Sequence, residues 1–312
     1  FSVGARMRFG FNLFSIDPAE FAEIAIACDD AGWDHLAIGE APFMPEHVSI
    51  PYPHSPDGER FWSLEVPVLD PWVAIAHMAT VTKRLRFMPG VLRMAIRKPL
   101  LEAKSACSIA AISDDRLAIG VGLGWMPEEY RFTNEDQKTR GARTGEAIEI
   151  LKLCMTGEFV EFHGKHYDFD RLIMRPAPKR PIPIYVGGHA EAALRRAAQL
   201  CDGWMGLSHG FEEAKAYIER LAQMRAEYGR QNEPFDIILN CPEANSIDDF
   251  RRLEDMGVTH CWVVPWHSPI GAAAGGGGEH DIDITAMFDE QPPLSRKIDA
   301  IRRFDDEVIA KL

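Results

Sequence analysis

Short apolar runs alternate with segments of helical periodicity along the whole chain. Apolar runs bounded by Gly, Pro, Asn or Asp are typical of strands, whereas apolar residues that recur every three to four positions predict helices. The predicted strands are residues 7–14, 35–39, 85–92, 117–123, 182–186, 203–207, 236–239 and 260–264. Strands and helices that alternate in this way indicate an α/β fold, with a parallel sheet wrapped by helices.

Helix ends carry recognisable signals between these strands. Asp17 precedes Pro18, and Glu20 follows three residues after the aspartate, which supplies an N-cap, a proline suited to the first turn and a capping-box partner. Asp70 and Pro71 repeat the signal before a second helix, which is predicted to run towards residue 84. Further helices are expected at about 100–112, at 142–155, around 193–198, at 212–228, after a capping box of Ser246 and Asp249, and at 295–310.

Strands alternating with helices over this length favour a single (β/α)8 TIM barrel, which needs about 250 residues. We expect one domain over residues 7–312, with insertions in the loops after the second, fourth and eighth strands and a hairpin within residues 159–179. Residues 1–6 are expected to be an added or flexible N-terminus. The alternative is a doubly wound open sheet, which is disfavoured because no strand leads into a G-x-G-x-x-G helix start.

The composition is that of an ordinary globular protein, with 312 residues of which 46% are hydrophobic and 26% charged. A net charge of -13 argues against a nucleic-acid partner, because such binding needs a basic surface. We expect no membrane association, since no apolar run is long enough to span a bilayer. The six cysteines are scattered without a C-x-x-C pair, which predicts buried free thiols and a cytoplasmic protein.

Loops that leave the carboxyl ends of the strands form the active site in a parallel barrel. Two of them, residues 40–69 and 265–293, are longer than usual connections and are predicted to be lids or binding loops. Gly187-Gly188-His189 follows a strand and opens a helix, so its backbone N–H groups suit a phosphate. A tight strand-to-helix turn without a ligand is the alternative interpretation.

Glycine occupies alternate positions of the fourth strand, at Gly120, Gly122 and Gly124. One strand face is therefore without side chains, which suits either tight core packing or a flat ring lying against the backbone. His163 and His166 flank a hairpin turn, and no other cluster of His, Cys or Asp has ligand spacing along the chain, so no metal site is expected.

Several segments of the chain, taken together, resemble the bacterial-luciferase-like oxidoreductase superfamily. They are, in order, residues 85–92 and 97–99, residues 116–125 with Glu129-Tyr130, residues 140–147, the hairpin turn 164–167, residues 183–188, and Asp202-Gly203-Trp204. The resemblance covers nearly the whole chain and depends on the order of these segments. It implies an enzyme that acts on a small organic substrate, and a homodimer, which is common in the family.

The family binds reduced flavin mononucleotide (FMN) or the deazaflavin coenzyme F420 at the carboxyl mouth of the barrel. The cofactor-binding residues that the resemblance and the loop positions imply are Gly90, Val91, Gly124, Gly187, Gly188, His189 and Trp204. Among them, Gly187, Gly188 and His189 are expected to hold the cofactor phosphate. A non-prolyl cis peptide near Gly90-Val91 is expected to support the ring. For Trp204, simple core packing is the alternative.

Residues 52–55 and 70–72 resemble a subgroup described as deazaflavin-dependent, which favours F420 over FMN. Dehydrogenases of that kind carry an acid–histidine pair after the second strand and a glutamate after the fourth. This chain has Glu40-Ala41 and Trp125 at those places. His47 lies further along the same loop and has a side chain with a pKa suited to proton transfer, although an ordinary loop residue is the alternative. Glu40, His47 and Trp125 are therefore predicted to face the substrate as the catalytic residues.

The leading hypothesis is an F420-dependent oxidoreductase that transfers hydride to or from a small organic substrate. A two-component FMN-dependent monooxygenase, served by a separate flavin or F420 reductase, is the alternative enzyme. A non-catalytic flavin-binding protein on the same barrel is the third hypothesis, and the missing acid–histidine pair is the feature that favours it.

Overall fold

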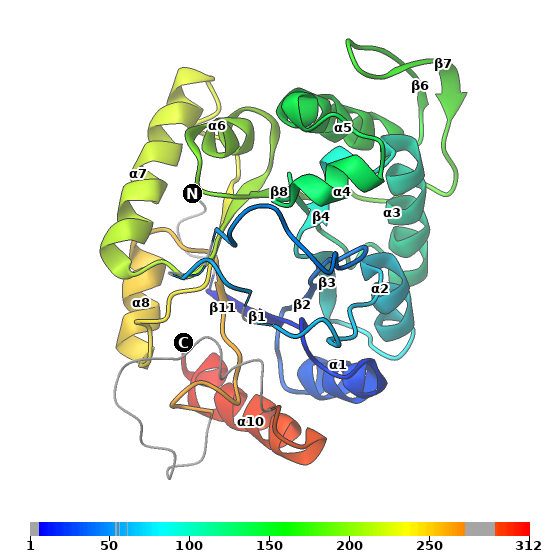
Figure 1. Cartoon of the computed structure of the whole chain (residues 1–312). Helices are drawn as coiled ribbons and strands as arrows, with labels where there is room; N and C mark the ends of the chain where they lie inside the picture. Colours follow the sequence, from blue (N-terminus) through cyan, green and yellow to red (C-terminus); the bar gives the residue numbers. More distant parts are fainter. Residues whose placement is uncertain (1–5, 54, 56, 61, 272–290) are drawn as a thin grey trace.

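A central ring of parallel strands is surrounded by helices in the computed structural model, which describes residues 6–53, 55, 57–60, 62–271 and 291–312 (Figure 1). The parallel strands are β1 (Arg8–Asn12), β2 (His35–Ile38), β3 (Arg86–Pro89), β4 (Leu92–Arg93), β5 (Ile119–Gly122), β8 (Ile184–Gly187), β9 (Gly203–Gly206), β10 (Asp236–Leu239) and β11 (His260–Trp262). Their positions match the predicted strands to within a few residues at each end.

The ring of strands is a closed barrel. The strands follow the order β3-β2-β1-β11-β10-β9-β8-β5-β4, and every neighbouring pair is parallel. A bridge between Phe87 and Leu117 joins β3 to the segment before β5, so the two ends of the sheet meet. Because β4 also pairs with β5, β3 and β4 are two halves of the third barrel strand. The predicted (β/α)8 barrel is confirmed.

The third barrel strand is interrupted, where residues 85–92 were expected to form one continuous strand. The peptide between Gly90 and Val91 is cis, at the position that the family resemblance implies. Ladder pairing stops at Pro89 and resumes at Leu92, which is why two short strands replace one.

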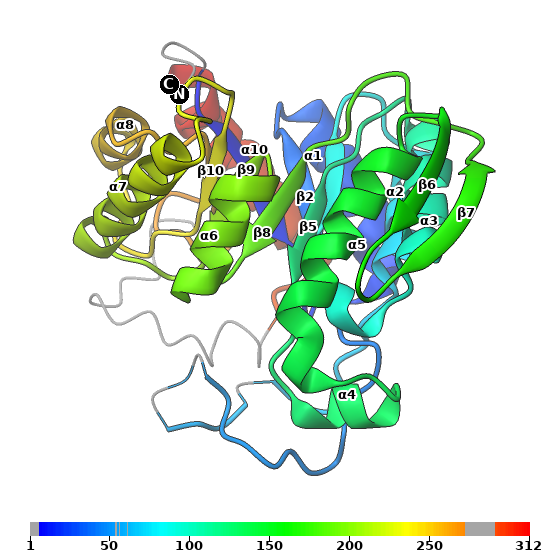
Figure 2. The ribbon, with the colours of Figure 1, turned by 90° about the horizontal axis from the view of Figure 1, so that it is seen from above.

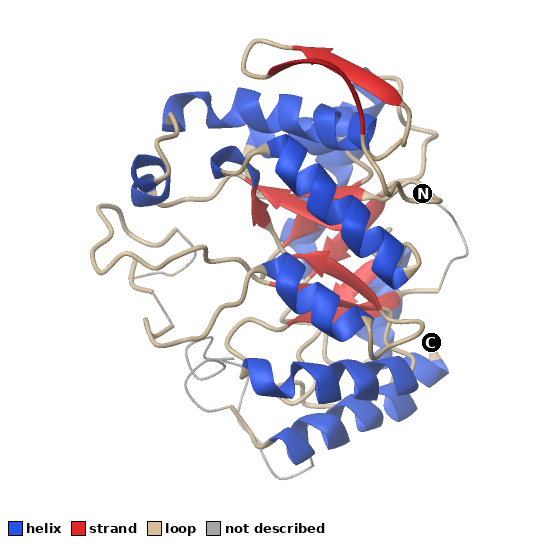
Figure 3. Cartoon of the chain, turned by 90° about the vertical axis from the view of Figure 1, so that its right-hand side faces the viewer, coloured by secondary structure: helices blue, strands red, loops and turns tan. Residues whose placement is uncertain are grey.

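Helices form the outer ring around the strands (Figure 3). They are α1 (Phe21–Asp30), α2 (Pro71–Ala79), α3 (Pro99–Ser113), α4 (Pro127–Phe132), α5 (Arg140–Cys154), α6 (Glu191–Leu200), α7 (Phe211–Glu227), α8 (Ile247–Asp255) and α10 (Leu294–Glu307). Short 3-10 turns lie at Pro18–Glu20, Met94–Ile96, Gln137–Thr139 and Ile309–Lys311. The predicted N-caps are confirmed, since Asp17 and Asp70 each accept a hydrogen bond from the backbone N–H two residues on, and Ser246 accepts one from Asp249. Glu20, which was expected as a capping-box partner of Asp17, instead forms an ion pair with Lys297 of the last helix.

Helix α2 ends at Ala79, so the expected continuation towards residue 84 is wrong. The Arg116 guanidinium donates to the carbonyl of Ala79 at 2.7 Å and thereby satisfies a group at the helix end. The Asp29 carboxylate accepts the N–H groups of Lys83 and Arg84 at 3.0 and 2.7 Å and holds them in a bend before β3. These two side chains come from α1 and from the segment after α3, and the local sequence pattern does not reveal them.

A two-stranded antiparallel hairpin, β6 (Phe159–His163) and β7 (Asp168–Ile173), confirms the predicted insertion and lies outside the barrel sheet. Its turn is anchored to α5, because the Glu146 carboxylate accepts the backbone N–H groups of Lys165, His166 and Tyr167 at 2.9–3.0 Å. Figures 1 and 3 show the hairpin on the outer side of the helix ring.

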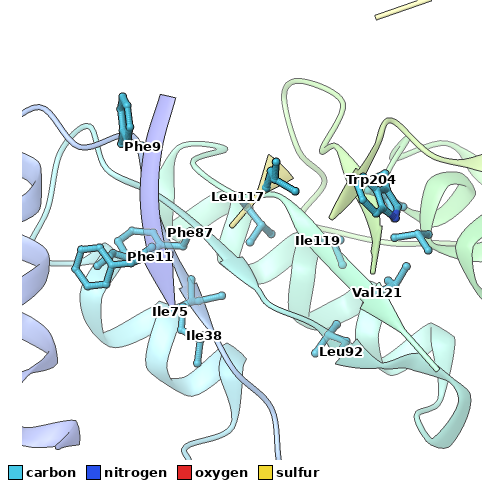
Figure 4. Close-up of a cluster of buried hydrophobic side chains, with 14 of the residues drawn as sticks. Phe9, Phe11, Ile38, Ile75, Phe87, Leu92, Leu117, Ile119, Val121 and Trp204 are labelled. Atoms are coloured by element: carbon cyan, nitrogen blue, oxygen red, sulfur yellow. The ribbon is translucent and has the colours of Figure 1, made fainter. Parts of the chain in front are cut away.

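Alternation along the strands divides the buried side chains into two cores. One set points outward and packs against the helices, and it includes Phe11, Phe87, Ile119 and Trp204 (Figure 4). The inward set fills the barrel and consists of Ala37, Met88, Ala118, Tyr185, Met205, Ile238 and Trp262. All six cysteines are buried free thiols, as predicted. No helix within the described residues is long and apolar enough to cross a membrane.

Polar side chains close the amino end of the barrel interior. The Trp262 indole N–H donates to His35 Nε2 at 2.7 Å, so His35 carries its proton on Nδ1 and donates it to Asp34 at 3.1 Å. His260 lies beside this pair with its ring centroid 5.3 Å from that of His35. Asp34, His35 and His260 have metal-ligand spacing, the one such group found in the described chain. Both nitrogens of His35 are engaged, so the arrangement favours a hydrogen-bonded plug over a metal site.

We predict that His260 makes the protein less stable in mild acid. Burial, reinforced by His35 and the nearby arginines, holds the pKa of His260 well below its usual value, so the folded state keeps the ring neutral. The unfolded chain takes up this proton below about pH 6.5, and the free energy of unfolding then falls by about 1.4 kcal/mol per pH unit. Chemical denaturation at pH 7 and pH 5 should show a smaller loss for His260→Asn than for the wild type. An equal loss in both proteins would contradict this assignment.

Candidate functional site

The carboxyl mouth of the barrel is poor in side chains along one arc. Continuing the inward alternation to the strand ends places Gly39, Gly90, Gly122 and Gly187 at the mouth, on four barrel strands from β2 to β8. Glycine leaves backbone atoms, with no side chain of their own, along this part of the mouth, which we call the glycine arc. Glycine at such positions lets a ligand approach the backbone closely.

Val91 packs against the glycine arc. Leu92 is buried in the outer core, so Val91 points inward, where it is partly exposed and packs against the inner core. A Cβ on Gly122 would lie 2.5 Å from Val91 Cγ2, and Cβ atoms on Gly120 and Gly187 would lie 3.2 and 3.3 Å from Cγ1. The glycines of the fourth barrel strand are thus explained by close packing against Val91. Of the two interpretations left open by the sequence, core packing applies to Gly120 and Gly122.

Asn12, at the end of β1, fixes the strand ends beside Val91. Its Nδ2 donates to the Gly90 carbonyl at 3.1 Å, while its Oδ1 accepts from the N–H groups of Gly39 and Phe14 at 3.0 and 2.9 Å. One side chain therefore ties together the carboxyl ends of the first three barrel strands. Sequence reasoning missed Asn12, although a lone amide at the end of an apolar strand was a usable signal.

The turn predicted to bind phosphate lies between β8 and α6. Gly188 has a φ of +118°, which favours glycine, and Gly187, Gly188 and His189 are partly exposed. Trp204 is fully buried in the outer core and donates from Nε1 to the Gly188 carbonyl at 2.9 Å. Its side chain therefore supports this turn from behind. The ring of His189 lies 4.3 Å from that of His209 between centroids.

Glu40 follows β2 and Gly39 at the mouth and is buried. It forms an ion pair with Arg97 and accepts the backbone N–H of Arg93. Arg97 also pairs with Asp70 and Glu102, at 3.0 Å each. Burial raises the pKa of Glu40, and the two arginines oppose that shift. This carboxylate is thus committed to holding the strand ends, and a cavity of about 170 Å³ borders it.

Glu129, on α4, was not among the predicted site residues. It has no exposed surface, its Oε1 lies 3.0 Å from Arg93 Nη1, and its Oε2 would lie 3.0 Å from a Cβ on Gly124. Burial raises its pKa to about 7, Glu40 and Glu128 add to the shift, and Arg93 opposes it. A glutamate four residues beyond Trp125 was visible in the sequence, but only the fold turns it back under Gly124.

The loop after β2 and helix α4 lie on the same side of the barrel (Figure 2). Tyr52 links them, with its ring 5.2 Å from Trp125 and 4.9 Å from Trp62 between centroids. His47 and Trp125 line a cavity of about 410 Å³ in this loop. The His47 side chain is 91% exposed, and Glu46 at 3.9 Å is its charged neighbour.

The structure therefore packs Val91 against Gly187, with Gly90 and Gly188 adjacent to them in the chain, and places Gly124 beside Arg93. Trp125 and His47 share the loop cavity, whereas Glu40 is held in the ion-pair cluster. The predicted loop at 265–293 lies mostly outside the described residues.

The sequence profile of the luciferase-like monooxygenase family matches residues 7–249. An uncharacterised protein of Mycobacterium tuberculosis is 37% identical over 306 residues, which cover 98% of this chain and 100% of that protein. The F420-dependent glucose-6-phosphate dehydrogenase of Nakamurella multipartita is 25% identical over 303 residues, which cover 92% of this chain and 80% of the dehydrogenase.

Two solved structures share the fold. An F420-dependent secondary alcohol dehydrogenase in complex with an F420–acetone adduct has a TM-score of 0.72 at 13% identity, covering 98% of this chain and 99% of its own. The oxygenating constituent of 3,6-diketocamphane monooxygenase from Pseudomonas putida, a type II Baeyer–Villiger monooxygenase in complex with FMN, has a TM-score of 0.59 at 17% identity, covering 80% and 71%.

The packing of Val91 on Gly122 predicts a coupled pair of substitutions. Gly122→Ala should lower the free energy of unfolding by about 1–3 kcal/mol, because its Cβ has no room beside Val91. Val91→Ala in the same chain should recover much of that loss, so a double-mutant cycle by urea denaturation will be non-additive. As a control, Gly145→Ala on α5 meets only an ordinary contact with Leu200 and should not destabilise. Additive effects of the two substitutions would show that Val91 does not occupy this space.

Proposed function

Because the chain belongs to the luciferase-like monooxygenase family, we propose that it is an oxidoreductase that binds coenzyme F420 at the barrel mouth and transfers hydride to or from a small organic substrate. The observation that carries this proposal is the arc of glycines around Val91 at the barrel mouth. A flat ring needs a surface of this kind, where backbone and one aliphatic side chain replace bulky groups.

The glycine arc and the turn after β8 suit the two ends of such a cofactor. The partly exposed Val91 would bear one face of the ring, and the glycines around it would leave room for the ring edge. Gly187, Gly188 and His189 precede α6, whose amino end favours a phosphate through its dipole and N–H groups. The buried Trp204 would keep this turn in shape without touching the cofactor.

The residues of the chain would bind, orient and shield the reactants. A bound deazaflavin supplies the hydride-carrying ring. Tyr52 and Trp125, from two different loops, pack together and would exclude water from the substrate side of the ring. Because His47 is almost fully exposed and Glu40 is ion-paired, neither is favourably placed to move a proton in this conformation. Glu129, whose pKa is raised to about 7, is better suited to hold one near the mouth.

FMN is the second candidate for the cofactor, with the protein acting as the oxygenating component of a monooxygenase that a separate reductase supplies. The FMN-bound structural neighbour and the family itself favour this candidate. The sequence relative that depends on F420 favours the first. We also propose that the protein is a homodimer and that it is cytoplasmic.

Fluorescence titration of the purified protein with F420 and with FMN tests the cofactor and its phosphate site. We expect tighter binding of F420, and a loss of affinity of about tenfold or more in Gly188→Leu, because a side chain at this backbone conformation distorts the turn. Gly229→Leu is the matched control, since Gly229 has a φ of +72° and open space around it. Tighter binding of FMN would reverse the cofactor assignment. Unchanged affinity in Gly188→Leu would remove the phosphate site from this turn.

A panel of alcohols, aldehydes, ketones and enones, assayed with oxidised and with reduced F420, tests the reaction. We expect at least one compound to change the cofactor's oxidation state at the same rate with and without oxygen, since hydride transfer consumes none. Gly188→Leu should lose this activity in parallel with cofactor affinity. Product formation that requires oxygen and reduced FMN would instead establish the monooxygenase. Binding without turnover across the panel would favour the non-catalytic protein.

A further inference from the structure

Arg93 occupies a position next to the proposed ring site that the proposed function leaves unused. It follows Val91 by two residues on the third barrel strand, so both side chains point to the same face, with Arg93 nearer to the mouth. Its Cδ and Cγ would lie 3.4 and 3.5 Å from a Cβ on Gly124, and 13% of its side chain is exposed. The Arg93 guanidinium therefore lies at the edge of the glycine arc, on the side of the loop that carries Tyr52.

The guanidinium of Arg93 has donors to spare. Its Nη1 lies 3.0 Å from Glu129 Oε1, yet Nη1 and both Glu129 oxygens are without a well-formed hydrogen bond among the described residues. Arg97, four residues further on, is different, because it makes hydrogen bonds to Glu40, Glu102 and Asp70. The guanidinium of Arg97 is thus occupied by three carboxylates, whereas the guanidinium of Arg93 can donate hydrogen bonds to a further anion.

The charges around Arg93 restrict how an anion can bind there. Arg93 and Arg97 are accompanied by the carboxyl groups of Glu40, Glu102, Glu129 and Asp70, so ionised acids outnumber the arginines. The groups that face Glu129 are Arg93 from β4, Glu40 from the loop after β2, and Glu128 and Tyr130 from its own helix. Another negative charge would be repelled unless one carboxylate became neutral. Glu129 is the member whose pKa, raised to about 7, allows that change near neutral pH.

We propose that Arg93 binds an anionic group of the substrate, a carboxylate or a phosphate, beside the ring, and that Glu129 takes up one proton from solvent as the anion binds. The incoming anion replaces the Glu129 carboxylate as the partner of Arg93, and the displaced carboxylate becomes a carboxylic acid, so the local charge stays constant. Glu129 is then a positioning residue that acts through Arg93. This inference rests on the proposed function, since it assumes that the substrate lies over the glycine arc.

The test uses the full chain without cofactor, inorganic phosphate as the probe, and infrared difference spectroscopy at pH 7. We expect phosphate to increase the carbonyl-stretch band of a protonated carboxylic acid. Glu129→Gln should lose this band, and Arg93→Gln should lose the response to phosphate or need at least about tenfold more of it. Phosphate bound at the turn after β8 would not produce this band, because that turn presents backbone N–H groups and a histidine.

Matched controls keep the outcome interpretable. Arg131→Gln replaces a neighbouring exposed charge of α4 and should leave the response to phosphate unchanged. Arg93→Lys keeps the positive charge and should retain part of the response, which separates loss of binding from loss of folding. The inference is overturned if phosphate produces no carboxylic-acid band in the wild type, or if the band persists in Arg93→Gln. Cofactor titration of Arg93→Gln is scored separately, so that unchanged F420 affinity leaves the proposed function intact when this inference fails.

Discussion

The mouth of this barrel depends on one steric constraint, which is that Val91 occupies the space that Cβ atoms on Gly120, Gly122 and Gly187 would need. The constraint joins three neighbouring barrel strands, because a side chain from the third lies across the inward faces of the fourth and fifth. Asn12 holds the adjacent strand ends together, so Val91 and the strand ends around it form one unit.

The two ends of the barrel interior are built in opposite ways. The amino end is filled by Asp34, His35, His260 and Tyr185, whose hydrogen bonds and ionic contacts satisfy polar groups away from water. At the carboxyl end, glycines leave backbone atoms at the inward positions. Tight, polar packing at one end gives the strands fixed positions, and the other end can then present backbone atoms to a ligand with little reorganisation.

The sequence predicted the barrel because hydrophobic periodicity and end signals are local properties. The predicted helix caps at Asp17, Asp70 and Ser246 are confirmed for the same reason. What the sequence did not reveal depends on register, which decides whether a strand residue points inward or outward. Trp204 points outward while Met205 points inward, and a shift of one residue would exchange them.

Contacts between residues far apart in the chain were also beyond local patterns. Glu129 meets Arg93 and Gly124 only after α4 folds back on the barrel mouth, and Asp34 meets His260 only when the barrel closes. The glycines of the fourth barrel strand were noticed, but their cause lay in Val91 on another strand. Family resemblance located the cis peptide at Gly90-Val91, which no pattern of residue types indicates by itself.

The hairpin formed by β6 and β7 has a different consequence. Its strands pair with each other and with no barrel strand in the described structure. The Glu146 carboxylate of α5 accepts hydrogen bonds from the backbone of its turn. The hydrogen-bond ladder of the barrel therefore does not pass through this segment. Residues can be added to or removed from the hairpin strands without changing the register of the strands that form the mouth. The hairpin is thus a natural attachment point, where a label or a second protein could be joined while the ligand-binding end stays as it is.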